Sequence, residues 1–108
     1  MAKRNVVWTH TARDQRRSIL KYWTIKNGSS VYAEKLIRLI TDRSKVIAQH
    51  PEAFKLSDFN DVRVSSLGHF SIFYKYNFNY IIIMAFWDNR QDPKELLEIA
   101  TKNNMGSL

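Results

Sequence analysis

The chain has 108 residues, 44% of them hydrophobic and 13% aromatic, which is enough for one core and predicts a single globular domain over residues 1–108. The absence of cysteine excludes a disulfide framework, a thiolate zinc site and a cysteine nucleophile. No apolar run approaches the ~20 residues that span a bilayer, and the start "MAKRNVVWTH" is too short and polar for a secretory signal. We therefore expect a cytoplasmic protein without a membrane partner.

The net charge of +7 is concentrated in the first half of the chain. Residues 1–45 hold eleven Lys and Arg against three Asp and Glu, whereas residues 46–108 hold six against seven. A positive field of this kind raises the rate of encounter with polyanions, either nucleic acid or an acidic protein segment.

The N-terminal third predicts a strand followed by a basic helix. "NVVWT" (residues 5–9) is β-branched and aromatic, as strands are. From Thr11, a candidate N-cap, apolar residues recur at helical spacing and cations fill the other positions, until Gly28 provides a C-terminal stop.

A second helix is expected directly after this one. Ser29 and Ser30 can cap its start, its apolar residues follow the 3.6-residue period, and Pro51 marks its end. The two helices joined by "NGSS" therefore form a helical hairpin. The next segment, residues 52–61, has no clean period and is interpreted as a loop.

Three strands are predicted in the second half. "DVRVSS" alternates, "HFSIFYKY" is rich in β-branched and aromatic residues, and "YIIIMAFW" is almost continuously apolar, which is typical of a strand covered on both faces or central in its sheet. The short turn-like segments between them favour antiparallel hairpins.

A short last helix is expected through Ala100. Asp92, Pro93 and Glu95 supply an N-cap acid, a proline at the first helical position and a capping-box acid. Residues 101–108 are expected to be a flexible tail. The resulting fold class is α+β: an N-terminal strand, a helical hairpin, a three-stranded antiparallel meander that completes a small sheet, and a short C-terminal helix.

Few residues suggest chemistry. There is no glycine-rich phosphate loop, and the histidines and acids lack metal-ligand spacing, so we expect no cofactor and no metal. Metal-independent RNA cleavage needs cations that stabilise the phosphorane, and Arg63 and Arg90 at strand ends are the candidate catalytic residues. Alternatively, Arg63 pairs with Asp58 or Asp61, and Arg90 with Asp88 or Asp92, as surface ion pairs.

Histidines and tyrosines are weaker candidates. His50, before Pro51, is interpreted as a helix C-terminal residue, and His69 could serve as an acid or base at a strand start. The tyrosines alternate with core positions and are interpreted as packing residues, or as base-stacking residues if they face a groove; they are Tyr74, Tyr76 and Tyr80.

The order of elements and the stretch "VRVSSLGHFSIFYKYNFNYIIIMAFWDNRQDPKEL" resemble the RelE/ParE superfamily of toxins from bacterial type II toxin–antitoxin modules. The resemblance covers about residues 5–98. It implies a growth-arresting toxin that a cognate acidic antitoxin neutralises, in a possible hetero-oligomer. RelE-like members cut mRNA in the ribosome, whereas ParE-like members inhibit DNA gyrase, so the target is the ribosome with its mRNA or gyrase.

The nuclease residues that the resemblance implies are only partly present. Arg63 and Arg90 match basic positions of RelE-like nucleases, but a further arginine of that pattern is Ser71 here and a lysine is Asp61. The C-terminal Tyr or His is also missing from "DPKELLEIA". Gyrase inhibition and mRNA cleavage both remain open, with a basic RNA-binding module that is not a toxin as the alternative.

Overall fold

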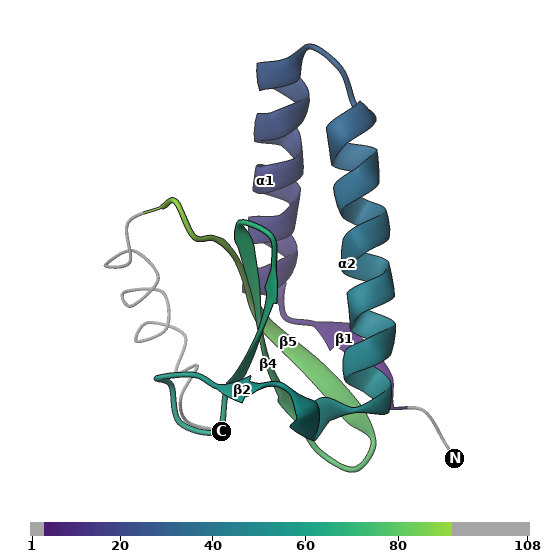
Figure 1. The fold of residues 1–108 in the computed structure, drawn as a ribbon, viewed down its shortest axis with the longest axis vertical. Helices are drawn as coiled ribbons and strands as arrows, with labels where there is room; N and C mark the ends of the chain where they lie inside the picture. Colours follow the sequence, from purple (N-terminus) through teal and green to yellow (C-terminus); the bar gives the residue numbers. More distant parts are fainter. Residues whose placement is uncertain (1–3, 92–108) are drawn as a thin grey trace.

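The computed structural model describes residues 4–91, which form an α+β fold (Figure 1). The elements follow in the order β1 (Asn5–Trp8), α1 (His10–Asn27), α2 (Val31–Gln49), η1 (Pro51–Ala53), β2 (Lys55–Leu56), β3 (Arg63–Leu67), β4 (Phe70–Tyr76) and β5 (Tyr80–Asp88). The predicted strand, helical hairpin and meander are confirmed. The helix predicted to start at Asp92 and the tail over residues 101–108 lie outside the described residues.

The five strands form one mixed sheet in the order β1-β5-β4-β3-β2. β1 pairs with β5 in parallel, and the other pairs are antiparallel. The loop predicted over residues 52–61 is wrong in part, because it contains η1 and the two-residue strand β2. Two residues are too few to show a period, and their strand conformation comes from pairing with β3.

The helix ends follow local capping rules. Gly28 ends α1 in the left-handed region at φ 64°, which glycine adopts without steric cost, and the predicted stop is confirmed. The predicted N-cap Thr11 is wrong, since α1 begins at His10 and the hydroxyl of Thr9 accepts from the N–H of Ala12 at 3.1 Å. α2 ends at Gln49, two residues before Pro51.

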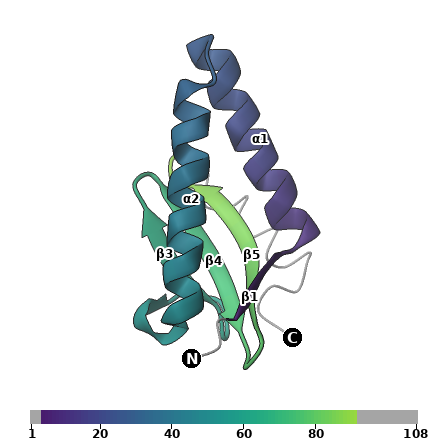
Figure 2. The same ribbon diagram turned by 90° about the vertical axis from the view of Figure 1, so that its right-hand side faces the viewer.

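The helical hairpin packs on one face of the sheet and shields the main core. Figure 2 shows α1 and α2 approaching each other at their connecting turn and diverging towards β1. Helix and sheet residues share this core, whose largest buried members are Leu36, Ile47, Phe70, Ile72, Tyr74, Ile81, Ile83 and Phe86. Neither helix of residues 4–91 is long and apolar enough to cross a membrane.

A one-residue bulge in β5 changes which side chains face the helices. Tyr74 of β4 pairs with Ile83 while the preceding Phe73 pairs with Ala85, so Met84 is the extra residue. Ile83 and Phe86 consequently both belong to the core under the helices. Ala85 joins a second cluster with Phe73, Trp87 and Val62. The almost continuous apolar run of β5 thus reflects packing against two clusters, as predicted.

Candidate functional site

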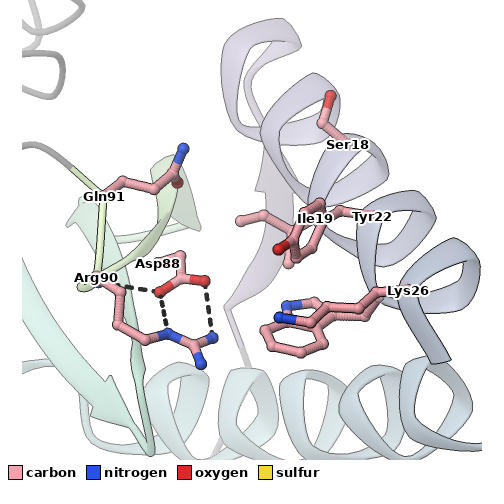
Figure 3. Close-up of a pocket in the computed structure, with 8 residues that line it drawn as sticks. Ser18, Ile19, Tyr22, Lys26, Asp88, Arg90 and Gln91 are labelled. Carbon is pink, nitrogen blue, oxygen red and sulfur yellow. Dashed lines mark hydrogen bonds and ion pairs between the residues drawn. The ribbon is translucent and has the colours of Figure 1, made fainter.

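The end of β5 carries a charged pair that projects towards α1. Asp88 accepts two side-chain bonds from Arg90, from Nε at 2.9 Å and from Nη2 at 2.8 Å, and a third from the Arg90 backbone N–H at 3.0 Å (Figure 3). The side chain of Asp88 is 12% exposed and that of Arg90 46%. The predicted ion pair between these two residues is confirmed. Its bidentate geometry fixes the guanidinium in one orientation.

Arg90 and α1 line a cavity of about 570 Å³. The Arg90 guanidinium carbon lies 4.8 Å from the ring centre of Trp23, and Lys26 Nζ lies 5.2 Å from the same ring. The other lining residues are Ser18, Ile19, Tyr22, Asp88 and Gln91. Two cations beside an electron-rich aromatic wall give a cavity suited to an anionic or planar group.

The electrostatics of this cavity keep Asp88 ionised. Burial acts to raise the pKa of Asp88, but the hydrogen bonds from the Arg90 side chain and backbone, together with its charge, outweigh that effect and lower the pKa below its usual value. Asp88 is therefore an acceptor for Arg90 and a poor general acid. Its negative charge also offsets that of Arg90, so Lys26 supplies the net positive charge of the cavity.

Arg63, the other predicted catalytic residue, serves a different region. Its Nη1 donates to the backbone carbonyls of Phe54, at 2.6 Å, and Glu52, at 3.3 Å, in the segment after α2. The predicted ion pair with Asp58 or Asp61 is wrong, since neither carboxylate lies within ion-pair distance of Arg63. The guanidinium of Arg63 instead donates to backbone carbonyls of a segment that has little regular structure to supply other donors.

The structure does not bring Arg63 and Arg90 together. Arg63 pairs with Tyr74 on β4, whereas Asp88, two residues before Arg90, pairs with Phe70. Four residues of β4 separate these positions, which is about 13 Å along the strand, and the two arginines flank β4 on opposite sides. The hydrogen bonds that each arginine makes hold the two guanidinium groups in separate regions of the sheet.

The three histidines of the chain are dispersed. His10 is exposed and pairs with Asp14 at 3.2 Å, and His50 is the C-cap of α2, as predicted. Exposed His69 lies in the β3–β4 turn, at the same end of the sheet as Arg90. Within residues 4–91 no three His, Asp or Glu side chains cluster closely enough to hold a metal ion.

Ser71 and Tyr74 are structural in this part of the chain. Ser71, where the resemblance to RelE-like nucleases implies an arginine, is buried and donates to the side chain of Asn89 at 2.8 Å. Tyr74 is fully buried, and its hydroxyl donates to the carbonyl of Pro51 at 2.6 Å. The packing role expected for Tyr74 is confirmed.

Two adjoining hollows form a groove between the helices and β1. We call this surface the hairpin groove; its residues are Arg4, Val6, Trp8, Arg16, Leu20, Ile37, Ile40, Thr41, Ser44, Lys45 and Ala48. The apolar residues provide its floor and the three cations its rim. Arg16 stacks on Trp8, with the guanidinium carbon 4.2 Å from the ring centre.

Sequence reasoning identified Arg90 but missed the wall opposite it. Tyr22 and Lys26 were not singled out, although an aromatic pair next to a lysine near the end of a basic helix was a usable signal. What could not be foreseen was that the bulge at Met84 brings Asp88 to the helix side of the sheet.

Comparisons with known proteins identify a matching family model and a similar fold. The family model described as "ParE toxin of type II toxin-antitoxin system, parDE" matches residues 6–93. The chain is also similar to a solved structure, "Chromosomal ParDE TA system from P. aeruginosa", with a TM-score of 0.68 and 22% identity. That match covers 78% of this chain and 94% of the other, and it shows a shared fold. No curated protein matches the chain.

Proposed function

Because the chain belongs to the ParE toxin family of type II toxin–antitoxin systems, we propose that it arrests growth by inhibiting DNA gyrase. The observation that carries this proposal is the family match, which spans residues 6–93 and so includes every described strand and helix except Asn5, the first residue of β1. Membership in a toxin–antitoxin family implies a cognate antitoxin as the natural partner.

The arrangement of the arginines favours gyrase over mRNA cleavage. Cleavage by attack of the 2′-hydroxyl needs a base, an acid and cations around one phosphate. Arg63 is bound to two backbone carbonyls and Arg90 to Asp88, and the two lie at different ends of β4. Among residues 4–91, Tyr22, Lys26 and His69 lie near Arg90 as possible proton carriers, but Arg63, the second candidate cation, does not join them.

The test compares the two targets directly. Purified toxin is added to gyrase and relaxed plasmid, and supercoiling is measured with and without the antitoxin. We expect loss of supercoiling, accumulation of gyrase-linked DNA breaks, and recovery when antitoxin is added. In induced cells, primer extension should show intact transcripts. Cut transcripts with normal supercoiling would instead assign the RelE-type activity.

The hairpin groove is the surface that best fits the antitoxin. Its apolar floor includes Ile37, which is 46% exposed, and Arg4, Arg16 and Lys45 lie around it. An acidic amphipathic helix would bury its apolar face on this floor and place its carboxylates against the rim. β1, the edge strand beside the groove, extends the same surface.

Replacing one apolar residue in the groove tests this assignment. Ile37→Asp should weaken antitoxin binding at least about 10-fold, because a carboxylate is desolvated and faces acidic side chains. Leu39→Asp is the matched control, since Leu39 is 42% exposed on the same helix and does not line the groove. Calorimetric titration of both variants measures the difference; equal loss in both would remove the groove from the interface.

A further inference from the structure

The solvent-facing side of α1 carries an evenly spaced row of cations. Arg13, Arg17 and Lys21 are each four residues apart and all exposed. They lie opposite the buried positions Ala12 and Ile19, so the row points away from the sheet. With a rise of 1.5 Å per residue, successive members are about 6 Å apart along the helix and the row spans about 12 Å.

The positive charge of this row is not neutralised locally. No carboxylate within residues 4–91 lies within ion-pair distance of any of the three, and the one acid on this face, Asp14, pairs with His10. The charges of this row also act on the neighbouring Arg16. Burial is the main cause that lowers the pKa of Arg16, and the charges of Arg13 and Arg17 lower it further. This side of α1 therefore carries a net positive charge, with three cations against the single carboxylate of Asp14.

The composition of the row favours a phosphate backbone over a protein segment. No apolar side chain lies between the three cations, and exposed Tyr22 and Ile25 follow only beyond Lys21. The row itself lacks the apolar centre that is common in protein interfaces, whereas the hairpin groove has one. A DNA duplex presents one phosphate per about 1.7 Å of its axis, hence about seven phosphates along 12 Å. Arginine and lysine rows of this kind hold a duplex without reading its sequence.

We propose that Arg13, Arg17 and Lys21 form a contact surface for the DNA phosphate backbone, through which the toxin engages DNA held by gyrase. This inference rests on the proposed gyrase function and names a second component of its target. The toxin then contacts enzyme and DNA together. The row borders the hairpin groove at Arg16 but contains no residue that lines it, so the two surfaces can be tested separately.

The first test measures binding to a labelled DNA duplex by fluorescence anisotropy, without gyrase. The triple variant Arg13→Gln, Arg17→Gln, Lys21→Gln removes three charges while keeping good helix formers. Losing three phosphate contacts should flatten the slope of log affinity against log salt by about 2.7, so the wild type should lose roughly 40-fold more affinity than the variant between 50 and 200 mM salt.

A matched control distinguishes the effect of this row on DNA binding from the effect of net charge. Lys35→Gln, Arg38→Gln, Lys55→Gln removes the same charge from exposed positions of α2 and β2, none of which lines the hairpin groove. We expect the control to retain most of the wild-type salt dependence. Equal effects of the two triple variants, or tighter binding of single-stranded RNA than of duplex DNA, would overturn the proposal.

The second test uses gyrase and keeps the two proposals distinguishable. If the row engages gyrase-held DNA, the α1 triple variant should need at least ~10-fold more toxin for half inhibition of supercoiling, with antitoxin affinity unchanged. A wild-type toxin that leaves supercoiling intact refutes the gyrase function itself. Wild-type inhibition with an unchanged dose for the variant refutes only the DNA contact, as does a loss confined to antitoxin binding.

Discussion

Arg63 and Tyr74 anchor the segment after α2 to the sheet. The guanidinium binds the carbonyls of Glu52 and Phe54, and the Tyr74 hydroxyl binds the carbonyl of Pro51. These carbonyls lie where α2 has ended and β2 has scarcely begun, so side chains supply the donors that a regular element would. Arg63 thus has a structural task that accounts for its position in β3.

Tyr74 makes this anchor dependent on pH. Burial, the main cause, raises the pKa of Tyr74 to about 12, against the opposing charge of Arg63. Between pH 10 and 12 the unfolded chain releases the phenol proton while the folded chain keeps it, so stability is full below pH 10 and falls as pH rises towards 12. The complete shift corresponds to roughly 2–3 kcal/mol.

Tyr74→Phe tests this linkage. At pH 7 the variant should be less stable by about 1 kcal/mol, because the Pro51 carbonyl loses its donor. As pH rises from 10 to 12 the gap should narrow and then reverse, because only the wild type loses the contribution of this phenol and that loss of roughly 2–3 kcal/mol exceeds the gap at pH 7. Urea denaturation of both proteins at pH 7, 10 and 11.5 measures it; a gap that stays constant would contradict the linkage.

At the scale of elements, the start of α1 continues the hydrogen bonding of β1. After Trp8, the last residue of β1, the N–H of Thr9 donates to the carbonyl of Ile83 at 3.0 Å and its hydroxyl to that of Met84 at 3.3 Å. The same hydroxyl oxygen accepts from the N–H of Ala12. Thr9 therefore caps the helix and closes the parallel pairing with β5.

Thr9→Ala should destabilise the protein by about 1–2 kcal/mol through loss of the N-cap. Thr11→Ala is the natural control, because Thr11 lies inside the helix, where alanine has the better propensity, and should be neutral or slightly stabilising. Urea denaturation of both variants measures the contrast. If Thr11→Ala were the more damaging change, the N-cap would be misplaced.

The elements that could be predicted from the sequence are mostly those marked by residues with a local effect on the backbone. Gly28, Pro51 and the β-branched runs act on their immediate neighbours, so strands and helices follow from them with errors of one or two residues. Thr9 and Thr11 are the same residue type, so the sequence does not show which of them caps α1. The pairing of β1 with β5, which ends at Trp8, decides that the helix starts after Thr9. The two-residue β2 has no local signal at all.

The site could be predicted only in part, for a similar reason. The pair of Asp88 and Arg90 is two residues apart and could be foreseen. The partners of Arg63 are carbonyls nine and eleven residues away, and carbonyl groups carry no residue signature. Trp23 faces Arg90 only because the chain folds back through two helices and four strands.

At the scale of the whole molecule, α1 contributes residues to all three candidate surfaces. One side lines the cavity with Arg90, another contributes Arg16 and Leu20 to the hairpin groove, and the third carries the exposed cations. A fourth side packs on the sheet. The orientation of this helix relative to β5 therefore sets the relation among all three surfaces.

One part-buried hydrogen bond helps to fix that orientation. The carbonyl oxygen of the Gln15 side chain accepts from the backbone N–H of Phe86 at 2.9 Å. β1 pairs with β5 only as far as Ile83, so this N–H has no strand partner on that side. Gln15 replaces the missing strand and ties the second turn of α1 to β5.

Gln15→Met keeps the length of the side chain and removes the acceptor, so it should cost about 1–3 kcal/mol by leaving the Phe86 N–H unsatisfied. Hydrogen exchange at the Phe86 amide should accelerate more than exchange at β4 amides, which are held by neighbouring strands and serve as the internal control. The loss should also weaken binding at surfaces far from Gln15, because α1 carries them all. Unchanged stability, or equal acceleration at Phe86 and in β4, would show that core packing alone orients the helix.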